Sequence, residues 1–217
     1  MGLVAKETGG TNFVPVPVGI HLARCYRVID LGTQKTTWQG AEKHLPKVML
    51  QFEVHGNDDS GKPIVTNKGE PMTISKNYTN SLGEKATLRQ DLKSWRGRDF
   101  TPLEREGFEL KNVLGIWAMI TVATSTGQDG KEYTNIANIN PVPSIMKQAG
   151  LPEGFNKTGV FWIEQPDMEM FETFSDNLKK KIQAAPEWKD AYNTIYQKEQ
   201  IAGANSGFDD MADDMPF

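Results

Sequence analysis

The amino-acid sequence predicts a mainly β fold with some helix: five strands, one helix between the third and fourth strands, and further helices after them. Three patterns support this fold class. Apolar and polar residues alternate along five segments, as they do in strands with one buried face. Between the third and fourth of these segments the apolar residues take helical spacing instead. From residue 144 onward the spacing is again helical.

The first strand pattern covers residues 14–22, where every even position is apolar. We expect those even positions to face the core, and Gly32 to end the strand after a less regular continuation. Residues 48–54 alternate cleanly, and a polar turn from Gly56 to Gly61 follows them. The remaining strand patterns cover 72–78, 114–122 and 132–139, with a hairpin turn at 127–130 between the last two.

The predicted helix between the third and fourth strands has Leu88, Leu92 and Trp95 at positions i, i+4 and i+7, and Gly97 ends it. Beyond residue 143, four apolar residues lie on one helical stripe, and Pro186 breaks that helix. We expect a second helix from there to about residue 200, and we expect both helices to pack back on the strands. The stripe consists of Phe171, Phe174, Leu178 and Ile182.

Three strands, a helix and two strands is the element order of the OB-fold, a five-stranded Greek-key barrel. Another small α+β barrel also fits this order. We expect an OB-fold domain over residues 1–143, a helical extension packed on the barrel over 144–202, and a flexible, disordered acidic tail over 203–217.

The formal net charge of the 217-residue chain is −4, which by itself argues against a nucleic-acid partner. The charge is unevenly distributed, however. Residues 1–143 carry 17 Lys and Arg against 15 Asp and Glu, and residues 144–202 carry 7 against 9. The last fifteen residues carry four Asp and no basic residue. Between Lys76 and Arg98 there are six basic and two acidic residues, so the body has a locally basic stretch.

Several function classes find no support in the sequence. Cys25 is the single cysteine, which excludes an internal disulfide and a multi-cysteine metal site. The segment 56–62 has the spacing of a phosphate-binding loop, but Pro63 follows where Ser or Thr is needed. The histidines lack metal-ligand spacing and no carboxylate cluster has recognisable spacing, so we expect no enzyme and no cofactor. Because neither a membrane segment nor an apolar signal segment is present, we expect a cytoplasmic protein.

Aromatic and basic residues suggest a nucleic-acid site. Trp38 lies among lysines in the connection after the first strand, where it either stacks on bases or folds over the barrel as a plug. Trp117 lies opposite the apolar stripe of its own strand, so it either points outward or is covered by the C-terminal helices. The candidate DNA-binding residues are Trp38, Lys35, Lys47, Lys76, Tyr78, Lys93, Arg96, Trp117 and Tyr133.

The chain ends in an acidic segment that follows a Gly-rich stretch and closes with Met-Pro-Phe. An apolar C-terminal residue preceded by acids suits capture in an apolar pocket rimmed by basic residues. This terminus resembles the C-terminal tip of bacterial single-stranded DNA-binding proteins. The resemblance implies docking onto replication, recombination and repair proteins. The candidate partner-binding residues are Asp213, Asp214, Met215, Pro216 and Phe217.

Three segments of the body resemble bacteriophage-encoded single-stranded DNA-binding proteins: Trp38-Gln39-Gly40, residues 78–82 (Tyr-Thr-Asn-Ser-Leu) and residues 88–101. The resemblance extends over most of residues 16–143 and implies an OB-fold. Compared with the cellular bacterial proteins, the body is longer, helices follow the barrel and the linker is shorter. The tetramer of the cellular family is therefore not expected here, and a monomer and a dimer both remain open.

We therefore expect a phage-type protein that binds and protects single-stranded DNA independently of sequence during replication or recombination and recruits partners through its acidic tip. Two alternatives stay open. The first is an OB-fold protein-interaction module of a replication or recombination complex. The second is a single-stranded RNA-binding protein, as in cold-shock barrels.

Overall fold

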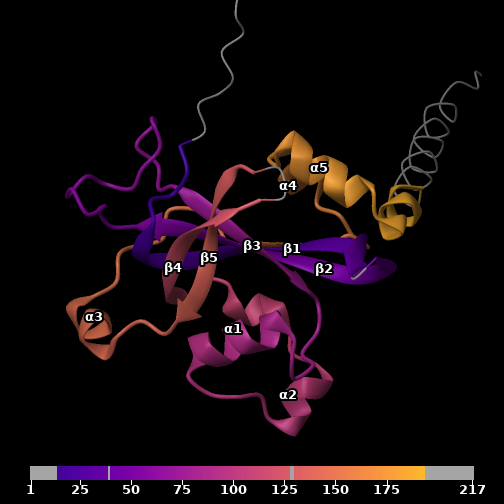
Figure 1. Cartoon of the computed structure of the whole chain (residues 1–217), viewed down its shortest axis with the longest axis horizontal. Helices are drawn as coiled ribbons and strands as arrows, with labels where there is room; N and C mark the ends of the chain where they lie inside the picture. Colours follow the sequence, from indigo (N-terminus) through magenta and orange to yellow (C-terminus); the bar gives the residue numbers. More distant parts are fainter. Residues whose placement is uncertain (1–13, 39, 128–129, 194–217) are drawn as a thin grey trace, which may run out of the picture.

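A computed structural model of the chain describes residues 14–38, 40–127 and 130–193, and Trp38 in its backbone only. Residues 186–193 form a helical segment, as expected after Pro186. No helix in the described ranges is both long and apolar enough to cross a membrane. The elements in chain order (Figure 1) are β1 (Gly19–Trp38), β2 (Ala41–His55), β3 (Thr73–Thr79), α1 (Thr87–Arg96), α2 (Pro102–Glu106), η1 (Leu110–Val113), β4 (Trp117–Thr126), β5 (Glu132–Asn140), α3 (Ser144–Ala149), β6 (Gly159–Phe161), α4 (Met168–Glu172) and α5 (Asp176–Gln183).

Six strands form one sheet, in the order β3-β2-β1-β4-β5, with β6 added to β1. The four pairs along that order are antiparallel, and the short β6 runs parallel to β1. The two edge strands approach each other, because Lys76 Nζ on β3 lies 3.5 Å from the Ala137 carbonyl on β5. No hydrogen-bonded ladder joins these edges in the described part of the chain, so the sheet is not closed. The predicted mainly β class with some helices is confirmed.

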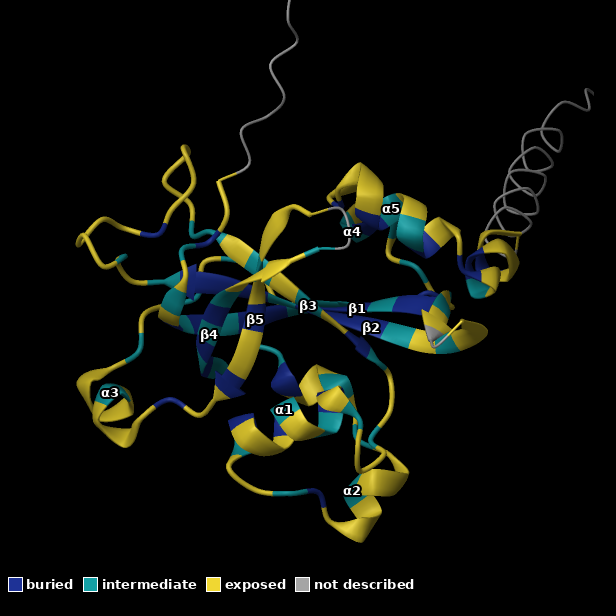
Figure 2. Ribbon diagram, viewed as in Figure 1, coloured by how far each residue is buried: buried dark blue, intermediate teal, exposed yellow. Residues whose placement is uncertain are grey.

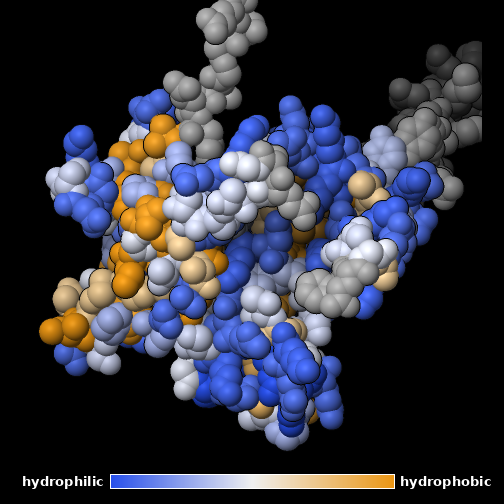
Figure 3. Space-filling view, in the orientation of Figure 1, coloured by the Kyte–Doolittle hydropathy of each residue, from blue (hydrophilic) through white to orange (hydrophobic). Residues whose placement is uncertain are grey.

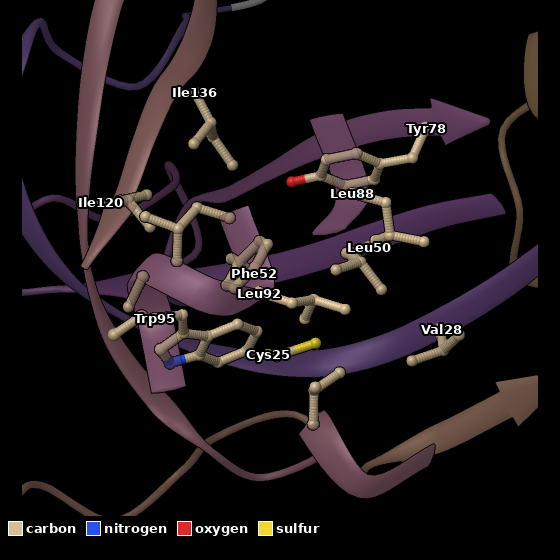
Figure 4. Close-up of a cluster of buried hydrophobic side chains, with 14 of the residues drawn as sticks. Cys25, Val28, Leu50, Phe52, Tyr78, Leu88, Leu92, Trp95, Ile120 and Ile136 are labelled. Carbon is tan, nitrogen blue, oxygen red and sulfur yellow. The ribbon is translucent and has the colours of Figure 1, made fainter. Parts of the chain in front are cut away.

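The inner face of the sheet packs against α1 to form the first core (Figure 4). Phe52 on β2 and Trp95 on α1 bring their ring centroids within 5.6 Å. The Trp95 indole N–H donates to the Trp117 carbonyl at 2.9 Å, so the buried polar atom is paired. Gly97 follows the helix with φ of 68°, the left-handed conformation that favours glycine at a helix end. The predicted helix and its buried face are confirmed.

The face of β1 that points inward is the opposite of the predicted one. Val18 is 53% exposed and Ile20 is 69% exposed, whereas Ala23 and Cys25 are fully buried. The reason is the pairing with β4, in which Ala23 lies opposite the buried Ala118. Val18 and Ile20 therefore face outward, whereas Val16, which precedes β1, is buried in the first core as predicted. Figure 3 shows the resulting concentration of apolar side chains on the side of the molecule where α3 lies.

Gly32 does not end the first strand, as the sequence suggested. It lies at a register shift inside β1, and the β1–β2 hairpin continues from there as an arm to the pair Trp38–Ala41. Gly32 has φ of 62°, and a Cβ added there would lie 2.6 Å from the Ala185 side chain. The glycine therefore permits a bulge and a close approach by the C-terminal segment rather than a turn.

A second core lies on the outer face of the arm (Figure 2). There α4 and α5 pack against Ile29, Leu31 and Met49 of β1 and β2. The predicted stripe of Phe171, Phe174, Leu178 and Ile182 is entirely buried in this core. The residues come from two helices and the turn between them rather than from one helix: Phe171 is on α4, Phe174 is in the turn, and Ser175 caps α5 by accepting a hydrogen bond from the Leu178 N–H.

The buried carboxylate of Glu53 on β2 attaches the connection between α3 and β6 to the outer face of the sheet. It accepts hydrogen bonds from Arg24 Nε at 2.8 Å, from the Phe155 N–H at 3.0 Å and from the Asn156 N–H at 2.6 Å. His55 Nε2 lies 3.1 Å from the same carboxylate. Burial raises the pKa of Glu53, but the hydrogen bonds from Asn156, His55 and Phe155 outweigh it and leave the pKa below its usual value.

Candidate nucleic-acid interface

A groove of about 560 Å³ lies on the outer face of the sheet, between the strands and the turn that joins α4 to α5. Strands β1, β2 and β3 form its floor, β5 forms one wall, and the α4–α5 turn forms the other. It is lined by Val16, Tyr26, Arg27, Gln51, Thr73, Ile74, Ser75, Asn77, Thr134, Asn135, Thr173, Phe174, Ser175 and Leu178. No carboxylate is among these lining residues. The groove is therefore neutral to positive and rich in hydroxyl and amide groups.

A cross-strand row of polar side chains forms the middle of the floor. Arg27 pairs with Gln51, and Gln51 pairs with Ser75 on the next strand. Arg27 reaches this face because β1 has a register shift between Cys25 and Arg27. Side chains alternate between faces along a regular strand, so Cys25 and Arg27 would otherwise share the buried face. The bulge thus places a cation in the groove.

Arg27 lies between two aromatic rings. Its guanidinium carbon is 5.5 Å from the centroid of Tyr26 and 5.5 Å from that of Phe174. These distances allow cation–π attraction on both sides and hold the guanidinium in place. The pKa of the Tyr26 hydroxyl is raised, mainly by burial, so the hydroxyl stays protonated at physiological pH, and the buried ring supports the guanidinium from within the fold.

Two polar atoms of this floor are buried without a hydrogen-bond partner in the described part of the chain: Arg27 Nε and Gln51 Oε1. An unpaired buried donor or acceptor costs about 1–3 kcal/mol. Both atoms are shielded from solvent in this conformation, so a ligand pairs with them only after the two side chains shift. The groove offers the Arg27 side chain and several amide and hydroxyl groups, which suit contacts with phosphates and bases.

Some of the residues predicted from the sequence lie on the arm, close to the groove or beyond it. Lys47 is on the same face of β2 as Met49, and its Nζ donates to Thr79 Oγ1 at 2.8 Å. Lys35 is exposed and pairs with Glu42 at 2.6 Å across the hairpin. Trp38 is the last residue of β1 at the tip of the arm, and its side chain lies outside the described residues.

Tyr78 and Lys76 on β3 have structural roles and do not form part of an exposed binding surface. Tyr78 is 3% exposed, and its hydroxyl donates to Asp91 Oδ2 at 2.8 Å. Lys76 Nζ pairs with the same carboxylate at 2.7 Å. Burial, followed by the nearby charge of Asp91, raises the pKa of Tyr78 well above its ordinary range. The ring is part of the core and does not stack on a base in this conformation, which corrects the expectation for Tyr78.

The basic stretch around α1 is neutralised by neighbouring acids. Lys93 pairs with Asp99 at 3.0 Å, and Arg96 pairs with Glu104. The Arg96 guanidinium also lies 4.4 Å from the centroid of the Phe100 ring. A hydrogen bond from Arg98 is the main cause that lowers the pKa of Glu104 to about 2. Arg96 thus links α1 to α2, and Lys93 links α1 to the connection between them. Helix α1 lies against the inner face of the sheet, on the side opposite α4 and α5 (Figure 1).

The other two aromatic candidates lie on outward-facing positions. Trp117 is half-buried on β4 and meets His55 edge-to-face, with ring centroids 4.9 Å apart. It borders the apolar outer face and does not line the groove. Tyr133 is 48% exposed on β5, next to Thr134 of the groove wall, so it lies at the rim.

The acidic tip falls outside the described residues: Asp213, Asp214, Met215, Pro216 and Phe217. The groove residues Tyr26, Arg27, Gln51 and Phe174 were not singled out from the sequence as binding residues. The sequence offers one signal that could have found this site: Arg27 is a charged residue between Tyr26 and the apolar Val28.

No protein-family model matches the chain, and no curated protein matches it.

Proposed function

We propose that this protein binds single-stranded DNA, independently of sequence, in the outer-face groove. The observation that carries the proposal is the position of Arg27 between Tyr26 and Phe174, beside the unpaired amide oxygen of Gln51. A cation binds any phosphate, and the exposed ring of Tyr133 at the rim offers a face to any base, so this chemistry is tolerant of sequence. The absence of a carboxylate from the groove lining supports a polyanionic ligand.

The strand order supports an OB-type arrangement that is left open between β3 and β5. In that fold, β1 pairs with both β2 and β4, and the outer face of the second and third strands binds oligonucleotides between two hairpin loops. Here the groove floor comes from β1, β2 and β3, and the β4–β5 hairpin supplies Thr134 and Asn135 to one wall. The location of the groove thus agrees with the proposed ligand.

Proteins that recognise single strands use electrostatics for affinity and stacking for contact with the bases. In this proposal Arg27 and Lys47 neutralise phosphates, while Tyr133 at the rim and Trp38 on the arm offer further rings. The acidic terminus recruits replication, recombination or repair proteins and, being of like charge to DNA, competes for the same groove. Deletion of residues 208–217 is expected to leave or raise DNA affinity while abolishing recruitment, and loss of DNA binding on deletion would contradict this part of the proposal.

The test is the anisotropy of a fluorescein-labelled oligo-dT strand titrated with the full chain and with Arg27→Gln. Hydrogen bonds to charged groups contribute about 1.5–3 kcal/mol, so we expect the Kd to rise by roughly 10- to 150-fold. Arg105→Gln on α2, an exposed arginine outside the groove lining, is the matched control and is expected to change the Kd little. No binding by the unchanged protein at micromolar concentration and low salt overturns the proposal. A matched RNA strand bound as tightly favours the RNA-binding alternative.

A protein-binding role is the second candidate, and one observation favours it. The apolar outer surface of β1 and β4 includes Val18 and Ile20, which are 53% and 69% exposed, next to a hollow lined partly by Met119 and Met146. Large exposed apolar patches on soluble domains commonly mark interaction sites. The same oligo-dT titration distinguishes the two roles, because a pure protein-binding module gives no salt-dependent anisotropy change.

A further inference from the structure

We propose that a second pocket, on the inner face of the sheet at the base of the arm, binds an organic ammonium ion whose apolar body is about as large as an aromatic ring, and that the Asp30 carboxylate on β1 holds its charged group. The pocket has a volume of about 420 Å³, which falls within the range of small-molecule sites. It shares no lining residue with the groove. The inference is therefore independent of the proposed DNA-binding function, and either can fail without the other.

Three neighbouring strands form the floor of this pocket. On β1, Val28 and Asp30 alternate with Ile29, which faces the second core, so Val28 and Asp30 share the inner face. Val48 on β2 is the register partner of Asp30, and Val160 on β6 is that of Val28. Both valines line the pocket together with Val28 and Asp30. The Asp30 carboxylate is therefore the polar group of an otherwise apolar floor.

The connection between α2 and β4 forms one wall of the pocket. There Phe108 and Leu110 pack against the first core but remain only partly buried. Trp162, which follows β6, is 54% exposed and lines the same pocket. Figure 4 shows Val28 at one side of the first core. An apolar ligand in the pocket extends the core on that side and shields these partly exposed side chains from water.

Asp30 is the charged lining residue that lacks a counter-charge. The other two charged residues of the lining, Lys111 and Glu109, pair with each other at 2.7 Å. Asp30 has no ion-pair partner in the part of the chain that the structure describes. The Gly32 N–H donates to Asp30 Oδ1 at 2.9 Å and orients the carboxylate. A carboxylate offers about four acceptor positions, so capacity remains for the N–H groups of an ammonium ion.

The charges around Asp30 favour a cation. Burial raises the pKa of Asp30, hydrogen bonds from the backbone of Gly32 and Ile163 lower it, and the negative charges of Glu187 and Glu164 raise it further. The net shift is upward, so the carboxylate is held in a negative potential without sufficient compensation. A bound ammonium ion supplies the missing positive charge.

The lining favours an organic cation over a metal ion. A hard cation such as Ca²⁺ takes about 6–8 oxygen ligands. Within the described ranges, no group of three or more His, Cys, Asp or Glu side chains could hold a metal. The apolar floor and wall instead suit a hydrocarbon body, and the exposed ring of Trp162 offers the aromatic face to which ammonium groups are attracted.

The experiment titrates the full chain with phenethylammonium and follows the indole N–H cross-peak of Trp162 in a ¹H–¹⁵N spectrum. The loss of that cross-peak in Trp162→Leu assigns it. We expect a Kd of about 1 mM or tighter for a ligand of this size. The neutral analogue 2-phenylethanol is expected to bind about tenfold more weakly, because hydrogen bonds between charged groups are the stronger ones.

Asp30→Asn separates the charge of the site from its shape. Asparagine keeps an oxygen that accepts from the Gly32 N–H, so we expect the Tm to change little. The variant is expected to bind phenethylammonium about tenfold more weakly and 2-phenylethanol with unchanged affinity, so that the preference for the ammonium ion disappears. Asp59→Asn, at an exposed position outside the pocket lining, is the matched control and is expected to keep the preference.

A third probe, n-butylammonium, imitates a lysine side chain and so distinguishes a small-molecule site from capture of a protein. It has a much smaller apolar body than phenethylammonium and is expected to bind at least about tenfold more weakly. Equal binding of these two ammonium ions overturns the inference. Equal binding of phenethylammonium and 2-phenylethanol by the unchanged protein, or an unaltered preference in Asp30→Asn, also overturns it. So does a Trp162 cross-peak that does not shift at about 10 mM phenethylammonium.

Discussion

Replacement of Glu53 by glutamine tests how the segment after α3 is held on the sheet. The Glu53 carboxylate is fully buried and accepts from Arg24, from the backbone of Phe155 and from both the backbone and the side chain of Asn156. In Glu53→Gln an amide N–H group replaces one of the two accepting oxygens. The new amide N–H group then faces the N–H groups that the carboxylate accepted from, and the Arg24 guanidinium loses its counter-charge.

The expected loss is large. Breaking a buried ion pair by removing one partner costs about 3–5 kcal/mol, against a total stability of about 5–15 kcal/mol for a typical domain. The pH dependence follows from the lowered pKa of Glu53. A carboxyl with a depressed folded-state pKa stabilises the fold above its usual value of 4.5 and loses this contribution as pH falls through the folded pKa.

The assay is urea unfolding followed by tryptophan fluorescence, at neutral pH and at a series of pH values below 4.5. We expect Glu53→Gln to be less stable at neutral pH and to show a smaller further loss on acidification than the unchanged protein. Ser75→Ala, an exposed position on β3 two residues from the one opposite Glu53, serves as the control. A stability change below about 1 kcal/mol in Glu53→Gln, with an unaltered pH profile, would refute the reasoning.

Three further substitutions test separate parts of the account. Gly32→Ala is expected to destabilise the protein by at least about 2 kcal/mol in urea unfolding, because it combines a positive φ with a 2.6 Å approach to the Ala185 side chain. Tyr78→Phe removes the hydrogen bond to Asp91 and is expected to cost about 0.5–1.5 kcal/mol of stability with no change in oligo-dT affinity. A loss of affinity in that variant contradicts the assignment of the ring to the core. Ile20→Ser on the outer face is expected to change the free energy of unfolding by no more than about 0.5 kcal/mol, because Ile20 is exposed. A loss above about 2 kcal/mol in the same assay would instead indicate that Ile20 faces the core, as the sequence predicted.

The parts of the fold that sequence reasoning predicted are those with a single apolar face. In α1 the spacing of Leu88, Leu92 and Trp95 leaves one possible buried side, and Gly97 marks its end. The second strand, β2, alternates cleanly, so its inner residues, such as Phe52, were predicted correctly. In both elements the local pattern identifies the face that packs in the first core, but β2 also buries Met49 and Glu53 on its other face, which the pattern does not show.

The first strand shows why a local pattern can mislead. Val18 and Ile20 are apolar, yet the pairing with β4 turns the smaller Ala23 and Cys25 inward. Ala23 and Cys25 leave room for the large rings of the first core, which come from other elements. Which face of a strand is buried depends here on its partner strands, and a stripe of apolar residues on the outer face has the same sequence pattern as one in the core.

The candidate site depends even more on long-range structure. Arg27 reaches the groove through a bulge, and Phe174 reaches it from the α4–α5 turn far along the chain. The basic stretch of the sequence predicted a binding surface, but Asp91, Asp99 and Glu104 pair with its cations. A charge count reveals which groups are present, whereas the fold decides which of them face one another.

The location of the interface is the central claim, and photocrosslinking tests it most directly. Oligo-dT containing 5-iododeoxyuridine, irradiated with the full chain and digested, links to the aromatic side chains that contact the bases. We expect a crosslinked peptide from the rim of the groove, carrying Tyr133 of β5, which is 48% exposed. Crosslinks confined to the peptides of α1 and α2, with none from β1, β5 or the α4–α5 turn, would contradict it.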